Sequence, residues 1–93
     1  MEDLILTLKS KYNKENIPLY KNYVFKKWLI KSDGSENFQF KFLSNQKSIP
    51  FIWLIESEEV KVKGQLLDRD WFRKRFGVDD CRASVAIWLI KNL

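Results

Sequence analysis

Lysines and tyrosines alternate within the first third of the chain in a way that suits a phosphate backbone. Residues 9–27 contain the lysines and tyrosines Lys9, Lys11, Tyr12, Lys14, Tyr20, Lys21, Tyr23, Lys26 and Lys27. Ammonium groups can neutralise phosphates, and the aromatic rings between them can stack on bases. The pattern therefore predicts a nucleic-acid contact. A solvated lysine-rich face beside core aromatics is the structural alternative.

A second basic group lies near the end of the chain. Arg73, Lys74 and Arg75 are consecutive, and we expect them to contact phosphates as well. Because consecutive residues point around most of a helix, these side chains cannot all face one ligand.

Catalytic residue types are scarce in this sequence. It has no histidine and a single cysteine, Cys81, which excludes Ser-His and Cys-His nucleophiles and an intrachain disulfide. Glu59 and Lys61, with Asp33 upstream, resemble the E-x-K part of metal-dependent nucleases with a PD-(D/E)xK core, in which carboxylates hold the metal ion. So short a match arises easily in a chain that is 31% charged. We therefore predict a non-enzymatic protein without a metal ion or a cofactor.

The length of the chain and the distribution of its charge indicate one domain with basic ends. The chain has 93 residues, 45% of them hydrophobic, which suits one domain with a core. The net charge of +5 divides into +4 for residues 1–31, −1 for residues 32–67 and +2 for residues 68–93. The helical ends are therefore basic and the middle is close to neutral. This favours an anionic partner, such as nucleic acid, an acidic protein or a membrane surface.

The hydrophobic pattern of the first half predicts a helix followed by strands. Residues 3–12 carry an apolar stripe at helical spacing, and residues 37–44 alternate as a strand. Asp33-Gly34 before that strand supplies the backbone geometry of a hairpin turn. Residues 19–31 combine helical spacing with a β-prone run, which leaves their structure open.

The second half is predicted to complete the sheet and then to become helical. We expect strands over residues 50–56 and 58–64. Asp68 or Asp70 caps a helix that Gly77 ends, and Asp79 caps the last helix. The predicted fold is a single α+β domain over residues 1–93. It has a small antiparallel sheet of three or four strands, an N-terminal helix and a C-terminal helical hairpin.

The closing segment, WFRKRFGVDDCRASVAIWLI, resembles the helix-turn-helix of bacterial transcription regulators. Phe72 and Phe76 take the apolar positions of the first helix, Gly77 the turn, and Val78 the buried position after it. Ala86 and Ile87 fall where the second helix packs on the first. The resemblance implies DNA binding. The polar positions left to contact bases are Arg82 and Ser84, whereas Asp79 and Asp80 stand where such motifs often have serine and arginine.

Three readings of this helical pair remain open: a DNA-binding element, a purely structural hairpin and a protein-binding surface. The partner is therefore nucleic acid or, as the alternative, an acidic protein bound by an inhibitor or adaptor module. The apolar last helix also allows a homodimer. We expect no membrane association and a cytoplasmic, intracellular location, because the sequence has no long apolar span and its cysteine is alone.

Overall fold

The computed structural model describes residues 2–93, which form two compact units. The N-terminal unit extends to Phe51, and the C-terminal unit begins at Ile52. The element order is one helix, four strands and three helices across the described residues. The predicted α+β class, with an antiparallel sheet, an N-terminal helix and C-terminal helices, is confirmed. The prediction of a single domain stays a prediction.

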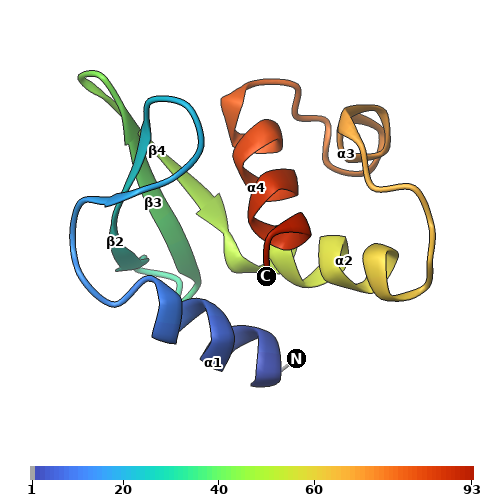
Figure 1. The fold of residues 1–93 in the computed structure, drawn as a ribbon, viewed down its shortest axis with the longest axis horizontal. Helices are drawn as coiled ribbons and strands as arrows, with labels where there is room; N and C mark the ends of the chain where they lie inside the picture. Colours follow the sequence, from blue (N-terminus) through green and yellow to red (C-terminus); the bar gives the residue numbers. More distant parts are fainter. Residues whose placement is uncertain (1) are drawn as a thin grey trace. The chain divides into compact units, whose positions relative to one another are not determined.

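The N-terminal unit places one helix beside a four-stranded antiparallel sheet. The sheet is a meander in the order β1-β2-β3-β4, and Figure 1 shows β2, β3 and β4 next to one another. The elements are α1 (Glu2–Lys11), β1 (Ile17–Pro18), β2 (Tyr23–Ile30), β3 (Glu36–Phe42) and β4 (Asn45–Pro50). The helix and the strand predicted for residues 3–12 and 37–44 are confirmed. The sequence left residues 19–31 open between helix and strand, and the structure has a strand at residues 23–30.

Buried aromatic rings join α1 to the sheet. Leu4, Leu8 and Tyr12 are buried at intervals of four residues, so they form one helical face. The Tyr12 ring lies 5.5 Å from Phe25 and 5.3 Å from Phe38, measured between ring centroids. The sheet contributes these rings from a single face because Phe25 is paired with Phe40, the second residue after Phe38.

The two hairpins of the sheet turn differently. At the β2–β3 turn, Gly34 has a φ of 85° and the Asp33 carboxylate accepts hydrogen bonds from the amide and hydroxyl of Ser35. This confirms the predicted Asp-Gly turn. The β3–β4 turn carries Leu43 at a φ of 55°, a conformation that leucine rarely adopts. No glycine marks that turn, and β4 was absent from the sequence-based prediction.

The C-terminal unit contains three helices, drawn in yellow to red in Figure 1. They are α2 (Phe51–Val62), whose first residue belongs to the N-terminal unit, α3 (Arg69–Phe76) and α4 (Cys81–Lys91). Trp53 of α2 stacks on Phe76 of α3 at 5.3 Å and meets Phe72 edge-on at 5.6 Å. The Lys61 ammonium donates to the Ile90 carbonyl at 2.8 Å, which ties α2 to α4.

Two predicted strands and one predicted cap are wrong. Residues 50–56 and 58–64 were expected to be strands, but α2 covers most of both. Val60 is 7% exposed and Val62 is 77% exposed, although strand alternation would place both on one face. Asp80, one residue beyond the predicted Asp79, is the N-cap of α4, and its carboxylate accepts from the Arg82 amide. Asp68 and Gly77 cap α3 as expected.

Within residues 2–93, no helix combines the length and the apolar character that crossing a membrane requires.

Candidate functional site

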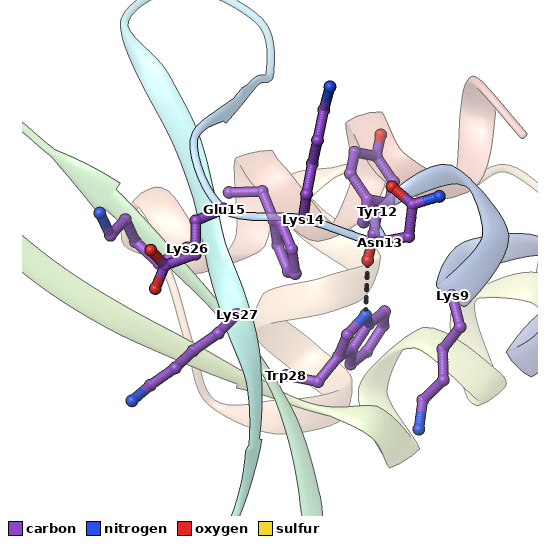
Figure 2. A pocket seen from close by; sticks show the side chains of 9 residues that line it. Lys9, Tyr12, Asn13, Lys14, Glu15, Lys26, Lys27 and Trp28 are labelled. Carbon is purple, nitrogen blue, oxygen red and sulfur yellow. Dashed lines mark hydrogen bonds between the residues drawn. The ribbon is translucent and has the colours of Figure 1, made fainter.

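A surface pocket lies in the N-terminal unit where α1 ends and β2 passes beside it. It holds a volume of about 360 Å³. We call it the lysine pocket, and Figure 2 shows its lining residues: Lys9, Tyr12, Asn13, Lys14, Glu15, Phe25, Lys26, Lys27 and Trp28. Four of these residues are lysines that the sequence pattern had singled out, including Lys26 and Lys27.

A β-bulge in β2 shapes one wall of this pocket. Phe25 pairs with Phe40 and Lys27 pairs with Gln39, so Lys26 is an additional residue in the ladder. Without the bulge, Phe25 and Lys27 would share a face. With the bulge, Trp28 lies on the same face as Phe25 in place of Lys27, and its partner in the neighbouring strand is Phe38. The bulge therefore brings an aromatic ring into the pocket and turns Lys27 away from the core face.

The indole of Trp28 is held in one orientation. Its Nε1–H donates to the main-chain carbonyl of Tyr12 at 3.0 Å, and Figure 2 shows this bond beneath the loop that follows α1. The indole meets Phe38 edge-on at 5.3 Å and Phe25 at 5.9 Å. Burial also raises the pKa of the Tyr12 hydroxyl. These contacts give the pocket a rigid aromatic wall.

The loop that borders the pocket is anchored to the same bulge. Asn16 has a φ of 65°, and its amide donates to the Phe25 carbonyl at 2.8 Å. The Lys26 ammonium donates to the Asn16 side-chain oxygen at 2.8 Å. Asparagine tolerates this left-handed conformation better than most residues. The loop and β2 therefore support each other across the pocket.

Charges around the pocket are mostly positive and mostly lack acidic partners. The lining has four lysines and one acid, Glu15, which gives a net +3. Lys9 is paired with Glu36 at 2.6 Å, and its ammonium also lies 5.6 Å from the Trp28 ring centroid. In the described part of the chain no ion pair holds Lys14 or Lys27. Figure 2 shows Lys9, Lys14 and Lys27 extending in different directions around Trp28.

The other predicted N-terminal residues lie outside the pocket. Lys11 lies 6.0 Å from the Tyr12 ring centroid, and Lys21 lies 5.6 Å from that of Tyr20. Tyr20 and Tyr23 contact each other at 5.3 Å in a separate aromatic group. These lysines therefore add to the basic character of the unit without lining the pocket.

The basic residues of α3 are held by acids of their own unit. Arg73 and Lys74 both pair with the Asp70 carboxylate, Lys74 at 3.0 Å. Arg75 pairs with Glu56 of α2 at 2.5 Å. The predicted cluster thus divides between two acids, as expected for consecutive residues on a helix.

Arg82 and Ser84, the residues of the last helix proposed to contact bases, also have partners within their unit. Arg82 pairs with Asp80 at 3.0 Å, and its guanidinium carbon lies 5.4 Å from the Trp53 ring centroid. Ser84 accepts from Arg69, which also pairs with Asp79 at 2.7 Å. The rest of α4 is largely buried, at Ala83, Val85, Ala86, Ile87, Leu89 and Ile90. A helix buried in this way has few side chains left for a DNA groove.

The residues considered for catalysis form no metal site. Glu59 and Lys61 are exposed on α2, and Asp33 lies in the β2–β3 turn. Cys81 is a free, half-buried thiol at the start of α4. In the region that the structure describes, no three histidine, cysteine or acidic side chains gather closely enough to hold a metal ion.

Sequence reasoning found the lysines of the pocket but not its aromatic wall. The sequence pattern did not place Trp28 and Phe25 beside the lysines, because their common face depends on a β-bulge that no glycine signals. Asn13 and Glu15 belong to a loop without a recognisable motif. Comparisons of the chain with protein-family models, curated proteins and solved structures found no match.

Proposed function

We propose that this protein is a non-enzymatic nucleic-acid-binding protein and that the lysine pocket is its main contact surface. The observation that supports this proposal is the arrangement of four lysines around the fixed ring of Trp28. Lysines contribute affinity by neutralising phosphates and releasing counterions, while an aromatic ring offers a stacking surface. Two further lysines of the N-terminal unit, Lys11 and Lys21, extend the basic surface.

The C-terminal helices are proposed as a weaker, second contact. The helix–turn–helix order of α3 and α4 fits the resemblance noted in the sequence, and DNA binding through Arg73, Lys74, Arg75, Arg82 and Ser84 follows from it. Each of these side chains already has a partner within its unit. A phosphate must compete with those partners, so we expect these residues to contribute less than the lysine pocket.

An acidic protein is the alternative partner, because exposed apolar side chains accompany the lysines. Leu6 and Ile30 of the N-terminal unit are 65% and 69% exposed. Such residues suit a protein interface more than a nucleic acid. A homodimer through α4 also stays a proposal, although most apolar residues of α4 are already buried. We keep the cytoplasm as the proposed location, since a lone cysteine suits a reducing compartment.

Two variants with the same change of charge test the proposal. Lys14→Ala/Lys26→Ala/Lys27→Ala and Arg73→Ala/Lys74→Ala/Arg75→Ala each remove three positive charges, so the net charge falls from +5 to +2 in both. Binding of labelled, random-sequence DNA and RNA, single-stranded and duplex, is measured by fluorescence anisotropy from low to physiological salt. We expect the lysine variant to lose about tenfold or more in affinity and to show a shallower salt dependence, and the arginine variant to change little.

Three results would count against the proposal. Absence of binding by the wild-type protein at low salt contradicts nucleic-acid binding altogether. Equal losses in both variants show that net charge matters and the pocket does not. A larger loss in the arginine variant assigns the contact to the helix-turn-helix. Salt-tolerant, stoichiometric capture of one acidic protein, combined with no nucleic-acid binding, favours the alternative function.

A further inference from the structure

We propose that the lysine pocket accommodates an unpaired base of a single strand, so that the protein prefers single-stranded nucleic acid to a duplex. This inference rests on the proposed function and makes it more specific. It concerns the shape and the lining of the pocket, whereas the proposed function concerns its charge.

The size of the pocket suits one flat group rather than a helix. Its volume of about 360 Å³ lies at the lower end of the range of small-ligand pockets. A duplex presents phosphates on its outside and keeps its bases stacked inside, so a recessed aromatic wall cannot reach them. A single strand can turn a base out of its stack and place it against a protein ring.

The aromatic wall is prepared for such a base before binding. Trp28 is fixed by its hydrogen bond to the Tyr12 carbonyl and by its contacts with Phe25 and Phe38. A ring held in place loses little conformational freedom when a ligand stacks on it. The stacking surface has no preference among bases, because every base has a π face.

The directions of the lysines favour a strand over an isolated phosphate. Figure 2 shows Lys9, Lys14 and Lys27 extending away from one another around Trp28. A single phosphate cannot contact all three ammonium groups at once, whereas successive phosphates of one strand can follow them. The chemistry recognised is therefore a base flanked by phosphates. Its source is a nucleic-acid strand rather than a free nucleotide.

Three kinds of oligonucleotide separate the base contact from the phosphate contacts. A labelled single-stranded DNA is compared with an abasic strand of the same length, which keeps every phosphate and lacks the bases, and with a duplex. We expect the normal strand to bind the wild-type protein about tenfold more tightly than the abasic strand at the same salt concentration. The duplex should bind more weakly than the normal strand at equal phosphate concentration.

A matched pair of tryptophan variants assigns the base contact to the pocket. Trp28→Phe keeps an aromatic ring but loses the bond to Tyr12, and Trp71→Phe makes the same exchange in α3. We expect Trp28→Phe to reduce the ratio between normal and abasic strands, and Trp71→Phe to leave it unchanged. The ratio is measured within each variant. A lower stability of the variant protein weakens its binding to both strands equally and therefore leaves the ratio unchanged.

The outcomes distinguish this inference from the proposed function. Equal affinity for normal and abasic strands overturns the inference and leaves phosphate binding intact. Absence of binding to every oligonucleotide overturns both. Displacement of the strand by an equal nucleotide concentration of free nucleoside monophosphate assigns the pocket to a small nucleotide. Displacement at a similar concentration by a peptide of aspartate and phenylalanine residues assigns it to an acidic protein. Either displacement overturns the inference.

Discussion

The lysine pocket and the C-terminal helical pair carry similar numbers of cations in very different surroundings. The pocket has four lysines and one acid in its lining, and among these lysines only Lys9 forms an ion pair within the described chain. Five of the six cations in the helical pair are held by acids of the same unit: Arg69, Arg73, Lys74, Arg75 and Arg82. The exception in the described part of the chain is Lys91, the last residue of α4.

Under the proposed function, a basic run in a sequence indicates an anion site only where acids do not already hold its charges. Exposed ion pairs such as Lys74–Asp70 contribute little to stability, because solvent screens both charges. They nevertheless reduce the positive potential that a phosphate meets, because each acid offsets the charge of its partner within a few ångströms. The helix-turn-helix resemblance rests on the residue types at the motif positions and takes no account of such ion pairs.

Removing the acids of the C-terminal unit should make the two regions more alike. Asp70→Asn/Glu56→Gln leaves Arg73, Lys74 and Arg75 without their carboxylate partners. We expect nucleic-acid affinity at low salt to rise about tenfold, with a steeper salt dependence, because released cations add phosphate contacts. Anisotropy titrations over a salt series measure both quantities.

A second double variant controls for net charge. Glu58→Gln/Glu59→Gln makes the same change of two charges on α2, at acids that form no ion pair in the part of the chain described here. We expect a smaller gain in affinity from it. Equal gains in the two variants would mean that the neutralisation of α3 is irrelevant and that only the total charge matters.

Sequence reasoning predicted the fold best where side-chain polarity matched burial. The alternation Phe38, Phe40, Phe42 was a reliable strand signal, because the first two rings are fully buried between more polar residues. In α2 the match fails in both directions. Ile52 is apolar but 53% exposed, and Ser57 is polar but buried, with its hydroxyl donating to the Trp53 carbonyl at 2.7 Å. The helical period of α2 was therefore hidden, and its apolar run and the alternation of Val60 and Val62 with lysines suggested two strands.

The candidate site was predictable in its charges but not in its geometry. Lys26 and Lys27 were identified because the sequence itself gives the identity, and so the charge, of each residue. Their position beside Trp28 depends on the register shift between β2 and β3, which results from pairing with a distant strand. The pairing of Arg73 and Lys74 with Asp70 was accessible from helical spacing, since they lie three and four residues after it.

Two neighbouring acids at the turn between α3 and α4 test how firmly the C-terminal pair is built. Asp80→Ala removes the N-cap of α4, and we expect the free energy of unfolding to fall by about 1 kcal/mol. Asp79→Ala removes only an exposed ion pair with Arg69, and we expect a fall of about 0.5 kcal/mol or less. Urea denaturation followed by circular dichroism gives both values. A larger effect at Asp79 would restore the cap position that the sequence suggested.

Acid titration of Asp70 gives the smallest effect and completes the contrast between the two regions. The hydrogen bond and the charge of Lys74, followed by the charge of Arg73, lower the pKa of Asp70 below its ordinary value of 3.8. A carboxyl with a lowered folded-state pKa stabilises the fold above its ordinary pKa, and this contribution is lost as the pH falls through the lowered value. We therefore expect a slight decrease in the free energy of unfolding below about pH 3.8, weaker in Asp70→Asn.

The lysine pocket offers no such carboxylate at Lys14 or Lys27, so variants of these lysines should keep the wild-type acid dependence. Urea denaturation at pH 5 and at pH 3 gives the free energy of unfolding of the wild-type protein, Asp70→Asn and Lys14→Ala/Lys27→Ala. Equal acid dependence in the wild-type protein and Asp70→Asn would show that Asp70 does not hold the α3 cations in solution. The neutralisation that separates the two basic regions would then be too weak to explain any difference in their affinity for phosphates.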